Sequence, residues 1–239
     1  MISRKLQLQM IILTAVGIIC AGGSITGTVK YDGKVPRMRK LKMDAEPICS
    51  AKHLTPVTAE WLLAGENGEL KNAFVYIKEG LGNREYPVPE EPVVLDQNGC
   101  IYSPHVLGLQ VGQNLEIRNS DGILHNIHAK PAVNKEFNRA QPKFKKKMIV
   151  TFDKPEIMLP VTCDVHPWMR GWIGVLNHPC FAVTDESGTF SIDSLDAGSY
   201  IIEVWHEKLG TKTAEVTITE DKGATVDFVL KRPPKKPKN

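Results

Sequence analysis

Hydrophobic and polar positions along the chain alternate in short runs, without a repeat every three or four residues. Runs such as ITGTVKYDG, AFVYIKEG, NLEIRNSDG and SYIIEVWHE are rich in β-branched and aromatic residues and are bounded by Gly, Asp, Asn or Pro. Such runs are typical of short β-strands, and no long helical periodicity is present. The pattern therefore predicts an all-β fold, either a sandwich or a barrel.

The amino end departs from this pattern. Arg4 and Lys5 precede an apolar run from Met10 to Cys20, and small residues follow it. This order is that of a secretory signal peptide, which we assign to residues 1–23. The run is too short to span a bilayer comfortably, although Cys20 leaves open the alternative of a lipoprotein cleavage site. We expect an exported protein, periplasmic or secreted, with no transmembrane span after cleavage.

Composition narrows the range of partners. A hydrophobic content of 42% suits a packed globular chain. The formal net charge of +3 is too small to indicate a nucleic-acid partner, and no nucleic-acid motif is present. Basic residues cluster in KFKKK at 143–147 and in the Pro-rich end at 231–239. These clusters are either a solvated strand face and a disordered tail or a means of steering toward an acidic partner or an anionic surface.

The stretch TCDVHPWMRG at 162–171 carries the candidate chemistry. It places Cys163, His166 and Met169 at intervals of three residues. A thiolate, an imidazole and a thioether are ligands of a copper electron-transfer site, in which two histidines and a cysteine form a trigonal plane and methionine binds weakly along the axis. The second histidine must come from elsewhere, and His125 in NSDGILHNIHA is the candidate. The alternative is that these residues only pack one end of the sandwich and bind no metal.

Two long segments resemble the cupredoxins, the family of blue copper proteins. VLGLQVGQNLEIRNSDGILHNIH at 106–128 resembles their first-ligand segment, and TFDKPEIMLPVTCDVHPWMRGWIGVL at 151–176 resembles their ligand loop and closing strand. The Cys-x2-His-x2-Met spacing is similar to that of the amicyanin group. The resemblance covers roughly 89–178 and implies a Greek-key β-sandwich. It also implies one type 1 copper ion, held by His125, Cys163, His166 and Met169.

The same resemblance assigns roles around the metal. Asn126 matches the asparagine that ties the two ligand loops together in many cupredoxins, and such groups orient metal ligands. His166 is expected at the surface, with Pro160, Pro167 and Trp168 as an apolar docking patch around its ring. The partner would be a redox protein that binds transiently, and the 143–147 run would rim the patch.

Other functions remain as alternatives. Copper oxidases and nitrite reductases reuse the cupredoxin fold but need further copper ligands, commonly from His-x-His pairs, and this chain has none. No other catalytic motif is present, so we expect no enzyme activity. A copper storage or sensor module is the alternative function. His128, three residues after His125, is interpreted as structural or superficial because strand alternation places the two on opposite faces.

The rest of the chain resembles a second family. ITGTVKYDGKVP at 25–36, ELKNAFVYIKEG at 69–80 and the hairpin at 181–210 resemble a carboxypeptidase regulatory-like sandwich of transthyretin type. In this interpretation the cupredoxin is inserted between the second and third strands of that sandwich. The expected boundaries are 1–23 for the signal peptide, 24–88 and 179–231 for the two parts of the regulatory-like sandwich, 89–178 for the cupredoxin, and 232–239 for a basic disordered tail.

Four cysteines remain after signal cleavage. Exported chains favour disulfides, and Cys49 and Cys100 are the expected pair. The alternative is a Cys2His2 metal site that adds His53 and His105. Cys180 is left over as a buried free thiol.

Overall fold

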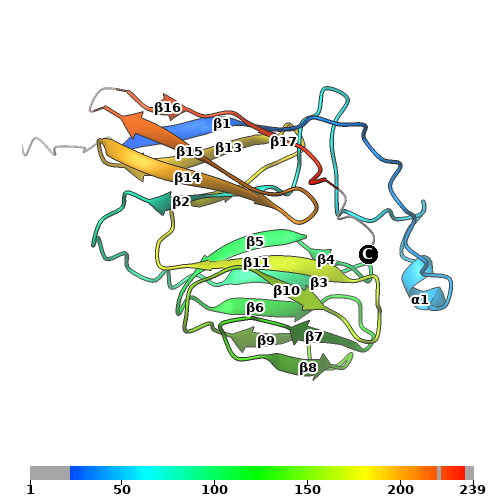
Figure 1. Ribbon diagram of the computed structural model, residues 1–239. Coiled ribbons are helices and arrows are strands. Elements are labelled where there is room, and N and C mark those ends of the chain that lie inside the picture. The colour runs from blue at the N-terminus through cyan, green and yellow to red at the C-terminus, as the bar shows by residue number, and fades with distance from the viewer. Residues whose placement is uncertain (1–21, 220–221, 235–239) are drawn as a thin grey trace, which may run out of the picture.

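The structure is a computed structural model that describes residues 22–219 and 222–234. The described chain is almost entirely β-strand, and it forms two stacked β-sandwiches (Figure 1). The predicted all-β class is therefore confirmed. The helix α1 (Pro47–Ser50) is a single turn. Most of the expected signal peptide at 1–23 and the end of the expected tail at 232–239 lie outside the described residues.

No helix in the described ranges combines the length and apolarity needed to cross a membrane.

The first sandwich, at the top of Figure 1, contains both ends of the described chain. One sheet has the order β13-β1-β16, with β17 also pairing β1, and the facing sheet has the order β12-β2-β14-β15. The strand bounds are β1 Gly23–Tyr31, β2 Phe74–Glu79, β12 Phe181–Val183, β13 Thr189–Leu195, β14 Gly198–His206, β15 Gly210–Ile218, β16 Ala224–Thr225 and β17 Phe228–Leu230.

The second sandwich holds the strands between β2 and β12. Its sheets have the orders β5-β11-β10-β7-β8 and β4-β3-β6-β9. The parallel pairing of β5 with β11 and of β3 with β6 means that this is not a simple meander. The bounds are β3 Val93–Gln97, β4 Tyr102–Ser103, β5 Val106–Gln110, β6 Leu115–Asn119, β7 His125–Ala129, β8 Phe137–Gln141, β9 Lys147–Val150, β10 Glu156–Thr162 and β11 Arg170–Leu176.

Strands β1 and β2 pair with strands that follow the second sandwich in the chain. Ile25 of β1 lies opposite Ile192 of β13, and Phe74 of β2 lies opposite Val183 of β12. The first sandwich is thus assembled from two segments that are far apart in sequence. The exact domain limits at 88 and 178 stay a prediction.

A layer of apolar side chains joins the two sandwiches. Phe74 and Tyr76 of β2 belong to one buried cluster with side chains of β5, β10 and β11. Two glycines in this layer, Gly108 and Gly174, lie directly beneath aromatic rings. A Cβ at Gly108 would come within 2.4 Å of Phe181, and one at Gly174 within 2.5 Å of Phe74. The sheets approach this closely because both positions lack a side chain.

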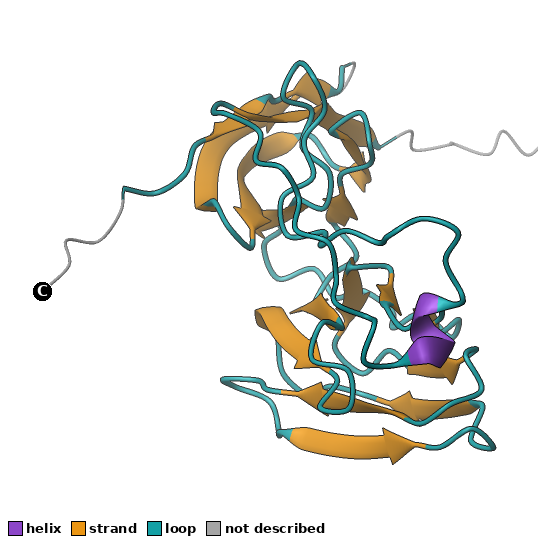
Figure 2. Ribbon diagram, turned by 90° about the vertical axis from the view of Figure 1, so that its right-hand side faces the viewer, coloured by secondary structure: helices purple, strands orange, loops and turns teal. Residues whose placement is uncertain are grey.

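The connection from β1 to β2 also crosses to the second sandwich. It carries α1, which lies beside the strands of the lower body in Figure 2. Met43 and Cys49 from this connection belong to the hydrophobic core of the second sandwich. A backbone hydrogen bond from Leu41 to Val57 (2.8 Å) closes the connection into a broad loop. We call residues 39–61 the covering segment.

The split first sandwich predicts that its C-terminal strands do not fold alone. Residues 179–239 without β1 and β2 leave sheet edges and apolar faces exposed. We expect this fragment to be unfolded by circular dichroism. We also expect full-length protein that is cleaved at an engineered protease site within 82–90, and then reduced so that no disulfide links Cys49 to Cys100, to elute as one particle with both fragments. A folded isolated fragment, or separation of the cleaved pieces without denaturant, would contradict the split arrangement.

A buried histidine at the end of β14 predicts how stability depends on pH. Burial lowers the pKa of His206 from 6.5 to about 4, so the unfolded chain binds the extra proton first as pH falls. Stability is therefore lost between pH 6.5 and 4, and at pH 4.5 this histidine should account for about 2 kcal/mol. Urea unfolding at pH 7 and 4.5 should show a smaller loss for His206→Asn, whereas equal losses would contradict the assignment.

Candidate metal centre

The four predicted ligands lie at one end of the second sandwich. His125 begins β7, while Cys163 and His166 lie in the loop between β10 and β11, which ends at Met169. His125 is fully buried, and the exposed fractions of Cys163 and His166 are 2% each. The antiparallel pairing of β7 with β10 brings the two segments side by side.

Three of these side chains converge on one point. His125 Nδ1 lies 2.9 Å from His166 Nδ1, and the Cys163 sulfur lies 3.8 Å from the same His166 nitrogen. One donor atom from each of the three residues falls within 4.8 Å of the others. Two imidazoles and a thiol facing one another suit a soft or borderline metal such as copper or zinc. The donor set therefore fits the copper ion that the sequence resemblance implies.

Met169 is held next to this cluster by its backbone. Its N–H donates to the carbonyl of His166 (2.9 Å), and its carbonyl accepts from the N–H of Cys163 (3.3 Å). The side chain is 99% buried, with an exposed fraction of 1%. The loop from Cys163 to Met169 is therefore a compact turn that keeps the thioether inside the sandwich.

Asn126 connects the two ligand segments. Its Oδ1 accepts from the Cys163 thiol (3.2 Å) and from the backbone N–H groups of Asp164 (2.7 Å) and Val165 (3.3 Å). Its Nδ2 donates to Asn138 on β8 (2.6 Å). This side chain thus fixes both the sulfur and the start of the ligand loop.

Asp121 orients the first histidine, and the sequence analysis missed it. His125 Nε2 donates to this carboxylate (2.8 Å), which leaves Nδ1 as the nitrogen that faces the cluster. The carboxylate also accepts from the backbone of Gly99 and Cys100 and pairs with Lys52 (3.1 Å). Burial alone would raise the pKa of Asp121, but these hydrogen bonds outweigh it and lower the pKa to about 2.

The surroundings of the cluster favour the metal-binding protonation states of Cys163 and His166, but not that of His125. Burial lowers the pKa of His125, but its interactions with Asp121 and Cys163 outweigh this and raise the pKa. Burial raises the pKa of the Cys163 thiol, yet the hydrogen bonds from His125 and nearby backbone lower it below its usual range. Burial, then the charge of His125, lowers the pKa of His166. A thiolate and a neutral imidazole are the forms that bind metal ions.

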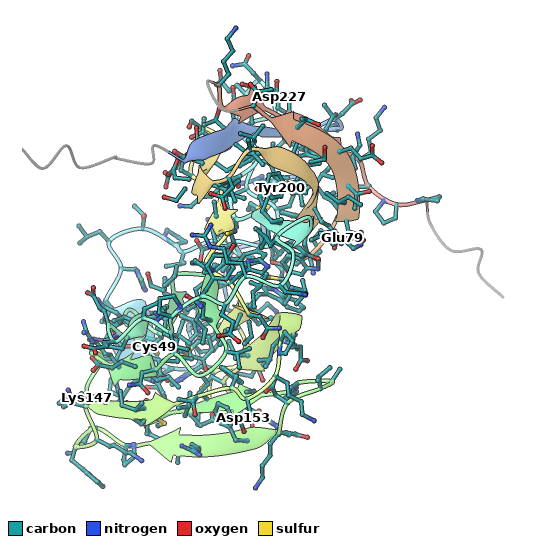
Figure 3. The ribbon with its side chains drawn as sticks, turned by 90° about the vertical axis from the view of Figure 1, so that its left-hand side faces the viewer. Cys49, Glu79, Lys147, Asp153, Tyr200 and Asp227 are labelled. Atoms are coloured by element: carbon teal, nitrogen blue, oxygen red, sulfur yellow. A yellow bond between two sulfur atoms is a disulfide. The ribbon has the colours of Figure 1, made fainter. Side chains whose placement is uncertain are left out.

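His166 is not at the surface, and the expectation that it would be is wrong. Its ring packs against Trp168, with centroids 5.2 Å apart, and the sulfurs of Cys49 and Cys100 lie within 4.8 Å of a ring nitrogen. Its Nε2 is buried with no hydrogen-bond partner among the described residues. The covering segment, which carries Cys49, shields this ring, and it belongs to the connection between two strands of the other sandwich (Figures 2 and 3).

Cys49 and Cys100 form a disulfide bond across this covering contact. The Cys2His2 alternative is contradicted, because His53 bonds the carbonyl of Gly99 (2.7 Å) and His105 points to Glu207 (2.7 Å). The sulfurs of Cys49 and Cys100 are bonded to each other and so are not thiolates that could bind a metal ion. Cys163 and Cys180 are buried free thiols.

The structure separates the residues of the predicted docking patch. Pro167 and Trp168 line a cavity beside the ligand loop. Pro160 lies on β10 opposite Trp172 and is not among the residues that line this cavity. His128 lies apart from the ligand cluster, between the carboxylates of Asp164 and Glu136.

No protein-family model matches the chain, and no curated protein matches it. Among solved structures, the chain is similar to a variant of amicyanin in its Cu(I) form, with 21% identity over 42% of this chain and 97% of that one (TM-score 0.32). It is similar to a copper-containing nitrite reductase from Thermus scotoductus SA-01, with 24% identity over 41% of this chain and 25% of that one (TM-score 0.31).

A purple cupredoxin from Nitrosopumilus maritimus is similar at 22% identity over 35% of this chain and 98% of that one (TM-score 0.30). The matched share is less than half of this chain in each of these three cases. The structures that resemble the chain thus include amicyanin and other cupredoxins.

The bonds to Asp121 predict a measurable loss of stability when its charge is removed. Asp121→Asn leaves buried donors without a full set of acceptors, which should lower the free energy of unfolding by about 2 kcal/mol without added metal. Glu136→Gln is a matched control, because Glu136 also bonds a histidine, His128, but at the surface. Urea unfolding should show little change for the control, and equal effects in the two variants would contradict the role of Asp121.

Proposed function

We propose that the chain is an exported protein that binds one copper ion and carries single electrons between redox partners. The copper ion would be held by the imidazoles of His125 and His166, the thiolate of Cys163 and the thioether of Met169. In this proposal the protein transfers electrons and catalyses no reaction of its own.

The observation that carries the proposal is the convergence of three donor atoms in a buried, hydrogen-bonded setting. His125 and His166 present the same kind of ring nitrogen to each other at 2.9 Å. Asp121 holds the far nitrogen of His125, and Asn126 holds the sulfur of Cys163. Packing alone does not account for two imidazoles that face one another beside a thiol, because a buried imidazole is costly without a polar partner.

A copper ion bound in such a set exchanges one electron between its two oxidation states. The protein keeps the donors in place by fixing each one through a second group. The turn from Cys163 to Met169 is closed by two backbone hydrogen bonds, and β7 and β10 hold the two ligand segments in register. Because the donors are buried and fixed, they need to rearrange little when an electron is gained or lost.

One metal centre is enough to account for the donor groups found. Two further clusters of metal-type donors occur in the described ranges, and each shares a histidine with the proposed site. One cluster consists of His166 and the two disulfide sulfurs, and the other consists of His125, Asp121 and Cys100. An electron carrier needs a single such centre, whereas copper enzymes of this fold class use additional ligands.

The redox partner is proposed to bind transiently on the side of the ligand loop. The edge of the His166 ring is covered, so a docking protein has no direct access to it. Pro167 is exposed and Trp168 is half-buried, and the Trp168 ring packs on His166. These two residues therefore offer the shortest apolar approach to the proposed metal.

A visible absorption spectrum and an electron paramagnetic resonance spectrum of the Cu(II)-loaded protein test the proposal. We expect an intense thiolate-to-copper charge-transfer band with narrow hyperfine splitting, because the Cys163 thiolate would be one of the copper ligands. The band should vanish in Cys163→Ser and His125→Ala. It should persist in Cys180→Ser, which removes the other buried free thiol.

Reversible one-electron reduction of the bound copper completes the test. It is monitored by the loss and return of the same band during a titration at an electrode. Copper that binds without the band, or a band that also disappears in Cys180→Ser, would refute the assigned ligand set. A correct band with no reversible reduction would leave a copper-binding protein but not an electron carrier.

A further inference from the structure

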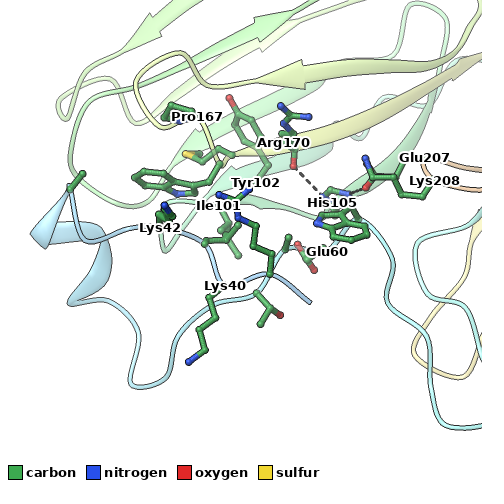
Figure 4. Close-up of a pocket in the computed structure, with 18 residues that line it drawn as sticks. Lys40, Lys42, Glu60, Ile101, Tyr102, His105, Pro167, Arg170, Glu207 and Lys208 are labelled. Atoms are coloured by element: carbon green, nitrogen blue, oxygen red, sulfur yellow. Dashed lines mark hydrogen bonds and ion pairs between the residues drawn. The ribbon is translucent and has the colours of Figure 1, made fainter. Parts of the chain in front are cut away.

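A cavity of about 760 Å³ opens beside the ligand loop. Most of its lining falls within five stretches, at 39–42, 58–61, 101–105, 167–170 and 207–208. The covering segment, the ligand loop and the β14–β15 hairpin of the first sandwich therefore meet around it (Figure 4). The volume is in the range that holds a small organic ligand.

The interior of the cavity presents fixed apolar and aromatic groups. Trp168 Nε1 donates to the carbonyl of Cys100 (2.9 Å), which fixes the indole in place. The Tyr102 hydroxyl donates inward to the carbonyl of Asn126 (2.6 Å). Ile101 and Trp61 complete an apolar lining that suits a planar ring.

The charges around this cavity are mainly positive. Five basic side chains line it against two acidic ones. Of the two carboxylates, Glu207 is already paired with His105 and Lys208. The remaining basic groups are exposed and form no ion pair within the described ranges; they are Arg39, Lys40, Lys42 and Arg170.

The cavity lies next to the loop that carries the proposed metal ligands. His166 is shielded by the covering segment, but Pro167, Trp168, Met169 and Arg170 all contribute to the cavity wall. A ligand of suitable size can thus approach the ligand loop where a folded protein cannot reach the His166 ring.

We propose that this cavity binds a small organic anion with a planar apolar body, seated on Trp168 and held by the unpaired basic groups at the rim. The chain's own end at 231–239 is excluded as occupant because its charge has the same sign. Binding does not require copper. Only the use of the bound anion in electron exchange rests on the proposed function.

Titration of the full-length copper-free protein with 8-anilinonaphthalene-1-sulfonate, an aromatic anion with fluorescence sensitive to burial, tests the site. We expect saturable binding of one probe molecule with quenching of tryptophan emission. The triple variant Arg39→Gln, Lys40→Gln, Arg170→Gln should raise the dissociation constant at least about tenfold. The matched control removes the same charge from the basic run outside the cavity, as Lys143→Gln, Lys145→Gln, Lys146→Gln, and should bind as the parent does.

The neutral analogue N-phenyl-1-naphthylamine separates charge recognition from apolar binding. It should bind more weakly than the sulfonate and should be insensitive to the triple variant. Equal loss of sulfonate binding in both triple variants, or equal affinity for the neutral and anionic probes, overturns the proposal. If the triple variant does not fold, the single variants Lys40→Gln and Arg170→Gln replace it in the same titration. Saturable sulfonate binding without a copper charge-transfer band would keep the anion site and remove the electron-carrier function.

Discussion

The arrangement of the candidate metal centre depends on one buried carboxylate, that of Asp121. It gathers donors from three separate parts of the chain: Lys52 in the covering segment, the backbone of Gly99 and Cys100, and the ring of His125. A buried carboxylate is tolerated only when its oxygens are hydrogen-bonded and its charge is balanced. Satisfying this one group therefore fixes the ring of His125, the first proposed ligand, and holds the covering segment against the sandwich at the same time.

The disulfide between Cys49 and Cys100 also holds the covering segment, and it does so beside His166. It joins α1 to the turn before β4, and both sulfurs lie next to the His166 ring. The covering segment is thus anchored by a covalent bond and by an ion pair, and its apolar residues enter the core of the second sandwich. As a result, the His166 ring is closed off from solvent, whereas Pro167, Trp168 and Arg170 border the basic cavity.

Sequence patterns were sufficient for the features that depend on neighbours along the chain. Strand alternation predicted the all-β class, and the spacing of Cys163, His166 and Met169 predicted a loop that the structure closes into one turn. Burial of His166 was not predictable because it results from contacts with a segment more than a hundred residues away, which has no strong periodicity. Asp121 was missed because an aspartate before Gly122 is also an ordinary turn residue.

The two glycines under the aromatic rings of the first sandwich limit how this protein can change over evolutionary time. Gly174 lies on β11, the strand that leaves the ligand loop, and Gly108 lies on its parallel neighbour β5. A side chain at either position requires a compensating change in Phe74 or Phe181, which belong to the other sandwich. The two sandwiches are therefore expected to be inherited together, and a recombination event that exchanged either one alone would produce a mismatched layer between them.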